Sequence, residues 1–591
     1  MRLHLMPFGR PPRSPTAAAL RLLLPLCARP PRAAVALSAA ASAPRTATAA
    51  TISTAAASVV AGARVGYVTD VEGNLPYWRD FCALSEVVDD SGGLDALALA
   101  DDTCHLVVGG DSVDKGPGDL RFLRSVLTLK ERYPDRVHLV LGNRDINKMR
   151  LLAELSDAHW LRAKDHPGVY WRRYAGPGGG PATPETFLAS QPDDDERGWT
   201  RDTTANRLRY MLADNMGSPR AFEFRRAELA ELAELAEIDG GMPHQGPQSQ
   251  APSDADVLRS FQDSVVMRGG LMRRYLEEAR LAVRIGDALF VHGGIQPGAI
   301  GHVPAARQGG APSVVEDVDD WISALNEFAK GQVREWCADC DRDGPPSWPG
   351  ADDRDSFGFF DRPGGQLLAY GMATRPDGTK SPTVVYSSFL NDGHPEPART
   401  EVVRWLAAAG IRALVVGHQP HGDSPVLMRC GSGDAPTDDG EPGPELIVVT
   451  ADTSFSGFTK WEDSVTIGPS NDDTTAPAAS ANTSTPPPSP PVFGNPRGPP
   501  PPIQDDPRGA AVVEVRLDVS ETNPCVVRVH GVLSDGRKVD CSVGDGAVGC
   551  AVADGKWWVK AQLEDGTWLL SRGEGYDAIN GEIADLPPHN A

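Results

Sequence analysis

The chain has 591 residues, with 57 Lys and Arg against 80 Asp and Glu, and a formal net charge of −23 at pH 7. So acidic a chain argues against nucleic acid as the main partner, because phosphate neutralisation needs Lys and Arg. The 61 Gly and 52 Pro require much of the chain to be loop, and the length allows more than one domain.

Residues 1–64 form a leader that is rich in Arg, Ala, Ser and Pro and contains no Asp or Glu. That composition is typical of a transit peptide for a plastid or a mitochondrion. The apolar run Ala17–Ala28 leaves a secretory signal peptide as the alternative. No later stretch approaches the roughly 18 uncharged apolar residues of a spanning helix, so we expect no membrane span.

The first predicted elements are a strand and a helix, followed by a βαβ unit at Leu106–Asp145. Each strand is a short apolar run that ends in a polar loop with glycine, and the helix of the unit has apolar residues at helical spacing. The carboxyl ends of neighbouring parallel strands meet at one edge of a sheet, where ligands bind. The predicted strands are Val65–Thr69, Leu106–Val108 and Val137–Leu141, and the predicted helices are Leu75–Leu84 and Leu120–Arg132.

Residues 146–281 carry little strand pattern and predict a helical insertion over one edge of the sheet. The helices expected there are Met149–Ala158, Asn206–Asn215, Arg225–Ile238 and Asp256–Val283. From there to residue 450 the pattern alternates between strands and helices. We expect strands at Ala288–Val291, Ile411–Val416 and Leu446–Thr450, and helices at Val314–Trp336 and at Ala398–Ala409, which Gly410 ends.

The nine cysteines are scattered along the chain, which implies no disulfide framework. Cys337 and Cys340 form the single CxxC pair, and no second Cys or His pair accompanies them. A reduced surface loop is therefore a better interpretation of this pair than a zinc site.

A proline-rich tract of low complexity covers residues 467–508 and predicts disorder, because it cannot bury enough apolar surface to fold. Strands are expected on both sides of it, so we interpret the tract as an insertion within one domain of residues 65–520. A β-rich extension follows at residues 521–591. There Asp565-Gly566 predicts the turn of a hairpin.

Five predicted strand ends carry an Asp, an Asn or a His with a glycine within three residues. Glycine lets the backbone turn tightly there and bring these side chains inward. Taken alone each residue is weak evidence, because a single His after a strand is usually structural. Together, carboxylate and amide oxygens with two imidazoles suit a pair of divalent metal ions that clamp a phosphoryl group. The five residues are Asp70, Asp111, Asn143, His292 and His418.

The order of the motifs is more specific than any one of them. Along the chain they are Asp-x-Glu at 70–72, Gly-Asp-x-x-Asp-Lys-Gly at 110–116, Gly-Asn-Arg-Asp at 142–145, His-Gly-Gly at 292–294 and Gly-His-x-Pro at 417–420. In this order they resemble the calcineurin-like metallophosphoesterases, nearest to the protein Ser/Thr phosphatase and diadenosine tetraphosphatase branches. The resemblance implies an α/β (α+β) fold, a two-sheet β-sandwich flanked by helices, and a hydrolase that acts on phosphoesters or phosphoanhydrides.

The resemblance also implies roles for individual residues. Asp111 would bridge two divalent ions, which are Mn, Fe, Zn or Mg, with Mn favoured. Asp114 resembles the acid that orients the catalytic His of the family, and Lys115 stands where a phosphate-binding Arg is usual. His421 is a weaker candidate ligand. The implied metal ligands are Asp70, Glu72, Asp111, Asn143, His292 and His418.

Two residues depart from the family pattern. Glu72 replaces a His ligand, and a carboxylate there favours the harder ions. Arg144 replaces the His that serves as general acid; it is always protonated and can stabilise transition-state charge, but it cannot donate a proton. We expect an Asp114–Arg144 ion pair and a substrate with a good leaving group. The alternative is an impaired pseudo-phosphatase that binds phosphate, a nucleotide or a protein, so the expected partners are phosphorylated small molecules, nucleotides or phosphoproteins.

Overall fold

Two large sheets carry the predicted strand ends. In the computed structural model, the described residues are 62–160, 183–191, 201–238, 251–307, 309–344, 346, 362–373, 381–391, 393–432, 443–462, 508–519, 524–544, 546–552, 555–574 and 577–586. The chain divides at Ser58, and all described residues belong to the unit Val59–Ala591. The leader up to residue 61 and nearly all of the proline-rich tract lie outside the described residues.

The first sheet has the strand order β18-β17-β16-β1-β4-β5. Strands β1, β4 and β5 are parallel, as expected for the βαβ unit, and β16 pairs antiparallel with β1 on one side and β17 on the other. This sheet therefore joins segments from both sides of residue 520. The strands are β1 (Ala63–Val68), β4 (Cys104–Val108), β5 (Val137–Leu139), β16 (Val512–Val519), β17 (Val526–Val532) and β18 (Lys538–Ser542).

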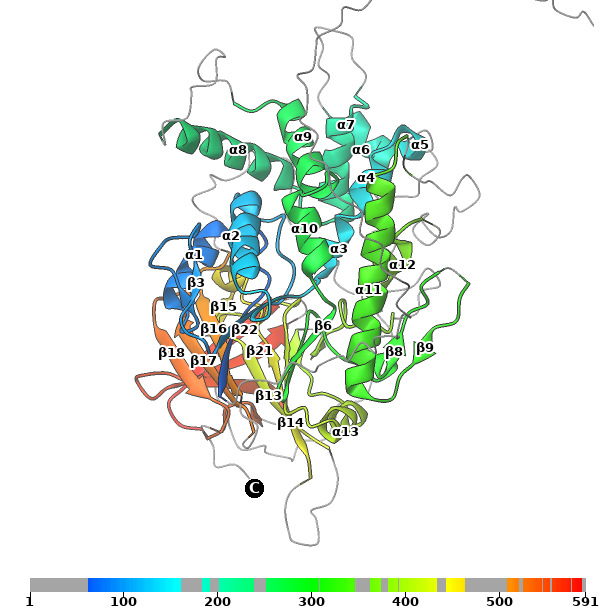
Figure 1. Ribbon diagram of the computed structural model, residues 1–591. Coiled ribbons are helices and arrows are strands. Elements are labelled where there is room, and N and C mark those ends of the chain that lie inside the picture. The colour runs from blue at the N-terminus through cyan, green and yellow to red at the C-terminus, as the bar shows by residue number, and fades with distance from the viewer. Residues whose placement is uncertain are drawn as a thin grey trace, which may run out of the picture. The chain divides into compact units, whose positions relative to one another are not determined.

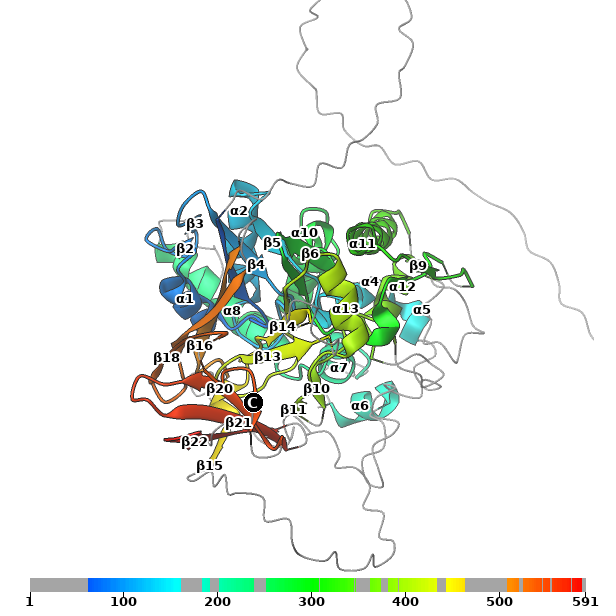
Figure 2. The same ribbon diagram turned by 90° about the horizontal axis from the view of Figure 1, so that it is seen from below.

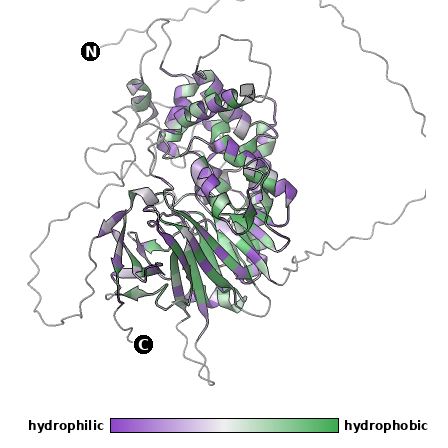
Figure 3. Ribbon diagram, turned by 90° about the vertical axis from the view of Figure 1, so that its left-hand side faces the viewer, coloured by the Kyte–Doolittle hydropathy of each residue, from purple (hydrophilic) through white to green (hydrophobic). Residues whose placement is uncertain are grey.

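The second sheet has the order β13-β14-β12-β7-β6, in which β7, β12 and β14 are parallel. Its strands are β6 (Ala282–Ile285), β7 (Ala288–Val291), β12 (Ala413–Val416), β13 (Val426–Gly431) and β14 (Glu445–Thr450). Alternate residues of both sheets, such as Val107 and Val415, share one buried apolar cluster. Their neighbours Val108 and Val416 belong to a second cluster with the helices. Both faces of these strands are thus apolar, and the strands are mostly hydrophobic (Figure 3).

The C-terminal hairpins and β15 form a third sheet, in which the strand order is β15-β22-β21-β20-β19. Gly566 has φ +88° in the turn predicted at Asp565-Gly566, and Trp557 and Trp558 on β20 are buried. Trp558 donates to the Leu427 carbonyl of the second sheet at 2.6 Å. The strands are β15 (Lys460–Glu462), β19 (Ala551–Val552), β20 (Trp557–Gln562), β21 (Trp568–Glu574) and β22 (Asp577–Ile583).

The helices of the predicted insertion gather on one side of the large sheets, next to α11 (Figures 1 and 2). Helix α10 packs against α2 of the βαβ unit. The helices are α1 (Leu75–Leu84), α2 (Asp119–Arg132), α3 (Asn143–Asn147), α4 (Arg150–Glu154), α5 (Asp157–Trp160), α6 (Pro184–Ser190), α7 (Thr204–Tyr210), the π-helix η3 (Met211–Asn215), α8 (Ala221–Ile238), α9 (Asp254–Val265), α10 (Leu271–Glu278), α11 (Val318–Cys340), α12 (Gly365–Tyr370) and α13 (Thr400–Ala408).

Short elements complete the described part of the chain. The two-residue strands are β2 (Val88–Asp89), β3 (Ala98–Leu99), β8 (His302–Val303), β9 (Ser313–Val314), β10 (Leu390–Asn391) and β11 (His394–Pro395), and the 3₁₀ turns are η4 (Pro297–Ala299) and η5 (Ser456–Phe458). The architecture as a whole is mixed α/β. Among the described residues, no helix has both the length and the apolar character needed to cross a membrane.

Three predicted elements were wrong. The helix expected at Met149–Ala158 is two short helices, α4 and α5. The single helix expected at Asp256–Val283 is split into α9, α10 and the start of β6: α9 ends at Val265, and Gly269, at φ +81°, lies in the turn that precedes α10. The CxxC pair is not in a loop: Cys337 and Cys340 lie in the last turn of α11, and Cys337 is buried. Helix α11 begins later than expected because Asp317 is its N-cap and accepts from the backbone N–H groups of the first turn.

Candidate metal centre

The predicted site residues follow strands β1, β4, β5, β7 and β12, and five of them adopt an unusual backbone conformation. In the described part of the chain, every non-glycine residue with a positive φ is one of the predicted site residues. Positive φ is uncommon for such residues and clusters at functional sites. The residues are Asp70 (φ 52°), Glu72 (51°), Asp111 (49°), Asp114 (100°) and His418 (75°).

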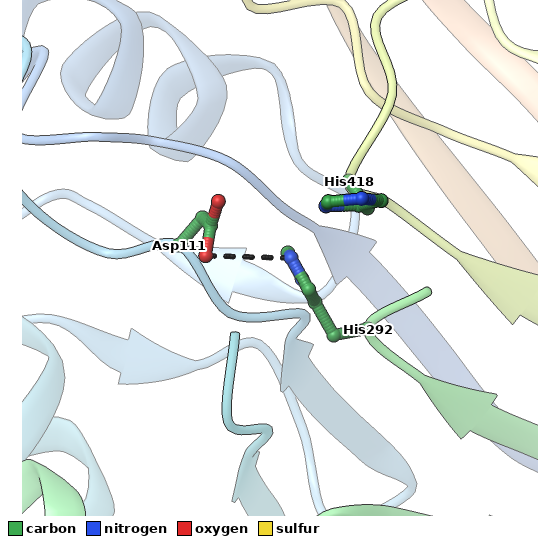
Figure 4. A group of neighbouring side chains, drawn as sticks. All are labelled: Asp111, His292 and His418. Carbon is green, nitrogen blue, oxygen red and sulfur yellow. Dashed lines mark ion pairs between the residues drawn. The ribbon is translucent and has the colours of Figure 1, made fainter. Parts of the chain in front are cut away.

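The first group of ligand-type side chains is Asp111, His292 and His418, whose candidate ligand atoms lie within 4.8 Å of one another (Figure 4). Nε2 of His292 is 3.3 Å from Oδ1 of Asp111 and 3.3 Å from Oδ1 of Asn143. Nδ1 of His292 is 2.8 Å from the Gly109 carbonyl. A carbonyl accepts only, so Nδ1 carries the proton and Nε2 is left for a ligand role.

The second group is Asp70, Glu72 and Asp111, again within 4.8 Å. Asp111 therefore belongs to both groups, which is the position of a bridging carboxylate. The backbone ties the groups together, because the N–H of His418 donates to Oδ2 of Asp70 at 3.0 Å. Five of the six predicted ligands fall in these groups, and Asn143 lies against His292.

Several buried acidic groups lie close together at the site. Burial, and then the charges of Asp452, Asp111 and Glu72, raise the pKa of Asp70 well above its usual value. Burial and the neighbouring His292 lower the pKa of His418 to about 3, so its imidazole is neutral, the form that binds metals. Nδ1 of His418 and Oε2 of Glu72 are buried without a hydrogen-bond partner. Hard oxygens, neutral imidazole and unsatisfied buried atoms all fit a divalent cation.

Arg144 and Lys115 lie beside these carboxylates. Nζ of Lys115 is 2.5 Å and Nε of Arg144 is 2.9 Å from Oε1 of Glu72. Nε of Arg144 is also 3.4 Å from Oδ2 of Asp111. The loop after η3 fixes the guanidinium, because Nη1 of Arg144 donates to the Met216 carbonyl at 2.8 Å and to Oγ of Ser218 at 2.9 Å. Two cationic side chains thus lie directly against the acidic groups.

The expected Asp114–Arg144 ion pair was wrong. Asp114 forms a buried ion pair with Lys148 instead. Lys148 lies one helical turn beyond Arg144, and its Nζ also reaches the Arg144 carbonyl at 3.3 Å. The guanidinium is engaged by Glu72 and Asp111, which leaves Asp114 to the Lys.

His421, the weaker candidate, is not brought to the two groups. Its Nε2 is 3.1 Å from Oγ of Ser571 on β21, and its carbonyl accepts from Nζ of the buried Lys560 on β20. The loop after His418 turns this side chain toward the third sheet.

Three further residues of the site were not assigned roles from the sequence. Asp145 is buried and accepts from the backbone N–H groups of Asp111, Ser112 and Gly142 at 2.8–3.0 Å, so it fixes the Asp111 loop. Asp452 is buried after β14, and burial and Glu72 raise its pKa to about 7. Its place after a predicted strand was a usable signal.

The third of these residues, Tyr386, has no local sequence signal. Its ring centroid is 4.6 Å from that of His418, and the residue is exposed, at 39%. The flanking carbonyls of Val384 and Ser387 accept from the N–H groups of Gly293 and Gly294 at 2.8 and 2.9 Å. This segment therefore contacts the loops of both His292 and His418.

No protein-family model matches the chain, and no curated protein matches it in sequence. Among solved structures, the cold-active protein-tyrosine phosphatase of a Shewanella species is 13% identical with a TM-score of 0.30, over 81% of this chain and 80% of that one. A protein serine/threonine phosphatase from Saccharomyces cerevisiae is 10% identical with a TM-score of 0.25, over 66% and 68%.

Proposed function

We propose that the chain is a metal-dependent hydrolase of phosphoesters or phosphoanhydrides with a binuclear metal site on a calcineurin-like, two-sheet fold. One observation carries the proposal: two groups of ligand-type side chains share Asp111. Asp70, Glu72 and Asp111 would hold one ion. Asp111, Asn143, His292 and His418 would hold the other, and the carboxylates favour Mn²⁺.

The chain's own residues have separate tasks in this proposal. Bound divalent ions supply a water-derived nucleophile and neutralise developing charge. Lys115 and Arg144 bind the phosphate oxygens, and the fixed guanidinium of Arg144 stabilises charge in the transition state. Asp145 keeps the Asp111 loop in its strained conformation. Arg144 donates no proton, so the leaving group must depart without one from this residue.

The test is metal analysis of the purified full-length chain together with a phosphoester and phosphoanhydride panel in added Mn²⁺. We expect Asp111→Asn to lower kcat/KM by more than about 100-fold, because it removes the shared ligand. Asp89→Asn, an exposed change on β2, should keep the wild-type rate. Inactivity with every metal, or an Asp111→Asn enzyme as active as the wild type, would refute the proposal.

A second candidate rests on Glu72, whose carboxylate is held by Lys115 and Arg144. If those ion pairs persist in the working protein, the site binds an anion without turning it over. Calorimetry with orthophosphate distinguishes the two candidates: tight binding with no hydrolysis in the whole panel favours the binding module.

A further inference from the structure

The loop that carries His418 joins β12 to β13 and spans residues 417–425. His418 has φ 75° in this loop, a conformation that is unfavourable for a residue other than glycine and persists only where the surroundings hold it. On the side of the metal centre, the N–H groups of Gly417 and His418 donate to the His292 carbonyl and to Oδ2 of Asp70, at 2.8 and 3.0 Å. The later residues of the loop are held from the opposite side, by the C-terminal extension.

Lys560 on β20 makes the central contact of the extension with this loop. The residue is completely buried, and its Nζ donates to the carbonyls of His421 and Ser424, the latter at 2.6 Å. Both carbonyls belong to the loop. Burying an amino group is unfavourable unless its N–H groups find acceptors, and the same holds for a buried carbonyl without a donor. The loop and Lys560 therefore stabilise one another in this arrangement.

Two side chains of the loop also bond to the extension. Oδ2 of the buried Asp423 accepts from the backbone N–H of Ser534, between β17 and β18, at 3.0 Å and from the hydroxyl of the same residue. Nε2 of His421 is 3.1 Å from Oγ of Ser571 on β21. The loop is thus fixed at three successive points by residues that lie more than 100 positions later in the sequence.

Gly422 allows the two parts to approach so closely. It has φ +78°, and a Cβ there would lie 2.9 Å from Oδ1 of Asn580 on β22 and 3.3 Å from Nζ of Lys560. A side chain at this position would therefore push the loop away from the third sheet. The close fit at Gly422 agrees with a loop whose conformation is set by the extension.

We propose that Lys560 is a positioning residue for the metal centre: through the carbonyls of His421 and Ser424, it keeps the loop in the conformation that presents His418 to one of the two ions. This inference rests on the proposed function and adds to it a residue of the C-terminal extension. His418 belongs to the group of Asp111 and His292, whereas Asp70 and Glu72 belong to the other group. Loss of the Lys560 contacts should therefore weaken the binding of one ion far more than that of the other.

The experiment titrates the metal-free full chain with Mn²⁺ by calorimetry. Wild type should bind two ions, and His418→Ala identifies the ion that depends on this imidazole. Lys560→Met should weaken the same ion by about 10–100-fold, as expected for a residue that orients a ligand, and the other ion by less than about threefold. Hydrogen exchange of the backbone N–H groups of residues 418–424 should become at least about tenfold faster in the metal-free variant, because the loop opens more often. Lys560→Arg, which keeps N–H donors, should fall between wild type and Lys560→Met.

Leu570→Ala is the matched control, since Leu570 is completely buried in the apolar cluster of the third sheet. It should lower thermal stability and leave both Mn²⁺ affinities and the exchange of the loop unchanged. If wild type binds two ions but Lys560→Met weakens neither or both equally, or if Leu570→Ala reproduces its effect, the positioning role is refuted and the proposed function stands. If wild type binds fewer than two ions, both are refuted. Should Lys560→Met fail to fold, Ser571→Ala, which removes the hydroxyl next to His421, is judged by the same criterion.

Discussion

At the scale of single residues, the site is assembled from backbone conformations that most side chains avoid. Each of the five positive-φ residues costs about 1–3 kcal/mol relative to a relaxed backbone, so the surroundings must hold it. They do so by hydrogen bonds between the loops: the N–H of Asp70 donates to the Gly110 carbonyl and that of Glu72 to the Asp111 carbonyl, both at 3.0 Å. The loops of β1 and β4 thus fix one another before any ligand arrives.

The Lys148–Asp114 pair gives a stability prediction. Both side chains are at most 2% exposed, and Lys148→Met would leave the Asp114 carboxylate buried without its cation. We expect a loss of about 3–5 kcal/mol in the free energy of unfolding, measured by chemical denaturation. Lys148→Met combined with Asp114→Asn should recover part of it. Lys330→Met, at the exposed pair with Glu327, is the control and should change stability by less than about 1 kcal/mol. Equal losses of stability for Lys148→Met and Lys330→Met would contradict this account.

Lys560 gives a pH prediction. Burial lowers its pKa to about 7, and its ammonium donates to the carbonyls of His421 and Ser424. In the unfolded chain the pKa of a lysine is about 10.4, so between pH 7 and 10 the unfolded state binds more protons and stability rises with pH. Below pH 7 Lys560 is protonated in both the folded and the unfolded state. It then no longer contributes to the change of stability with pH.

The measurement is the free energy of unfolding at pH 7 and pH 9. From pH 7 to pH 9 the free energy of unfolding of wild type should rise by up to about 2 kcal/mol more than that of Lys560→Met, because the variant lacks the titrating group. Lys538→Met, an exposed change on β18, should keep the wild-type slope. If Lys560→Met shows the same rise as wild type, the buried ammonium does not titrate in this range.

At the scale of elements, helix α2 depends on a residue of the insertion. Its N-cap is Gly118, which has no side chain to accept from the first turn. The buried Glu228 of α8 fills this role: its carboxylate accepts from the N–H groups of Leu120 and Arg121 at 3.1 and 3.0 Å. The negative charge of Glu228 also interacts favourably with the positive, N-terminal end of the α2 helix dipole. The insertion thereby stabilises the helix that follows the Asp111 loop.

Glu228→Ala should therefore cost about 1–2 kcal/mol of stability, the size of a lost N-cap, as measured by thermal or chemical unfolding. Glu231 is the matched control on the same helix, since its side chain is 50% exposed and pairs only at the surface with Arg121. Glu231→Ala should cost less than about 1 kcal/mol. A larger loss from Glu231→Ala than from Glu228→Ala would show that the cap is unimportant.

The elements that the sequence predicted well are those with a local cause. The bounds of α1 and β7 agree with Leu75–Leu84 and Ala288–Val291, because an N-cap Asn, a helical apolar period and a bounded apolar run are all local signals. The long helix predicted at Asp256–Val283 was wrong because the turn that contains Gly269 was not recognised.

The same distinction between local and non-local causes holds for the site. Five of the six predicted ligands lie in the two groups, since each follows a strand end within a recognisable motif. The partner of Asp114 was mistaken, because the choice between Arg144 and Lys148 depends on where Glu72 lies in space. Tyr386 and Arg508 reach the site from segments remote in sequence, and no pattern near them reports that contact.

At the scale of the whole molecule, the proline-rich tract separates strands that belong to different sheets. The last strand before it, β15, pairs with β22, and the first strand after it, β16, pairs with β1 and β17. Replacing Gly468–Pro507 by a Gly/Ser linker of about ten residues should change the free energy of unfolding by less than about 1 kcal/mol, because closure cost grows slowly with loop length. Unfolding or aggregation of this variant would show that the tract contributes to the fold.

The position of β16 in the first sheet has a consequence for how the chain folds while it is being synthesised. Strand β1 leaves the ribosome first, yet its antiparallel neighbour spans Val512–Val519, in the register that joins Ala63 to Val519. Until the ribosome has passed Val519, β1 can pair only with β4 and presents a bare edge on its other side. Pairing at so great a sequence separation makes folding slow and exposes the nascent chain to aggregation. Chains stopped at residue 507 should therefore depend on chaperones for solubility far more than full-length chains do.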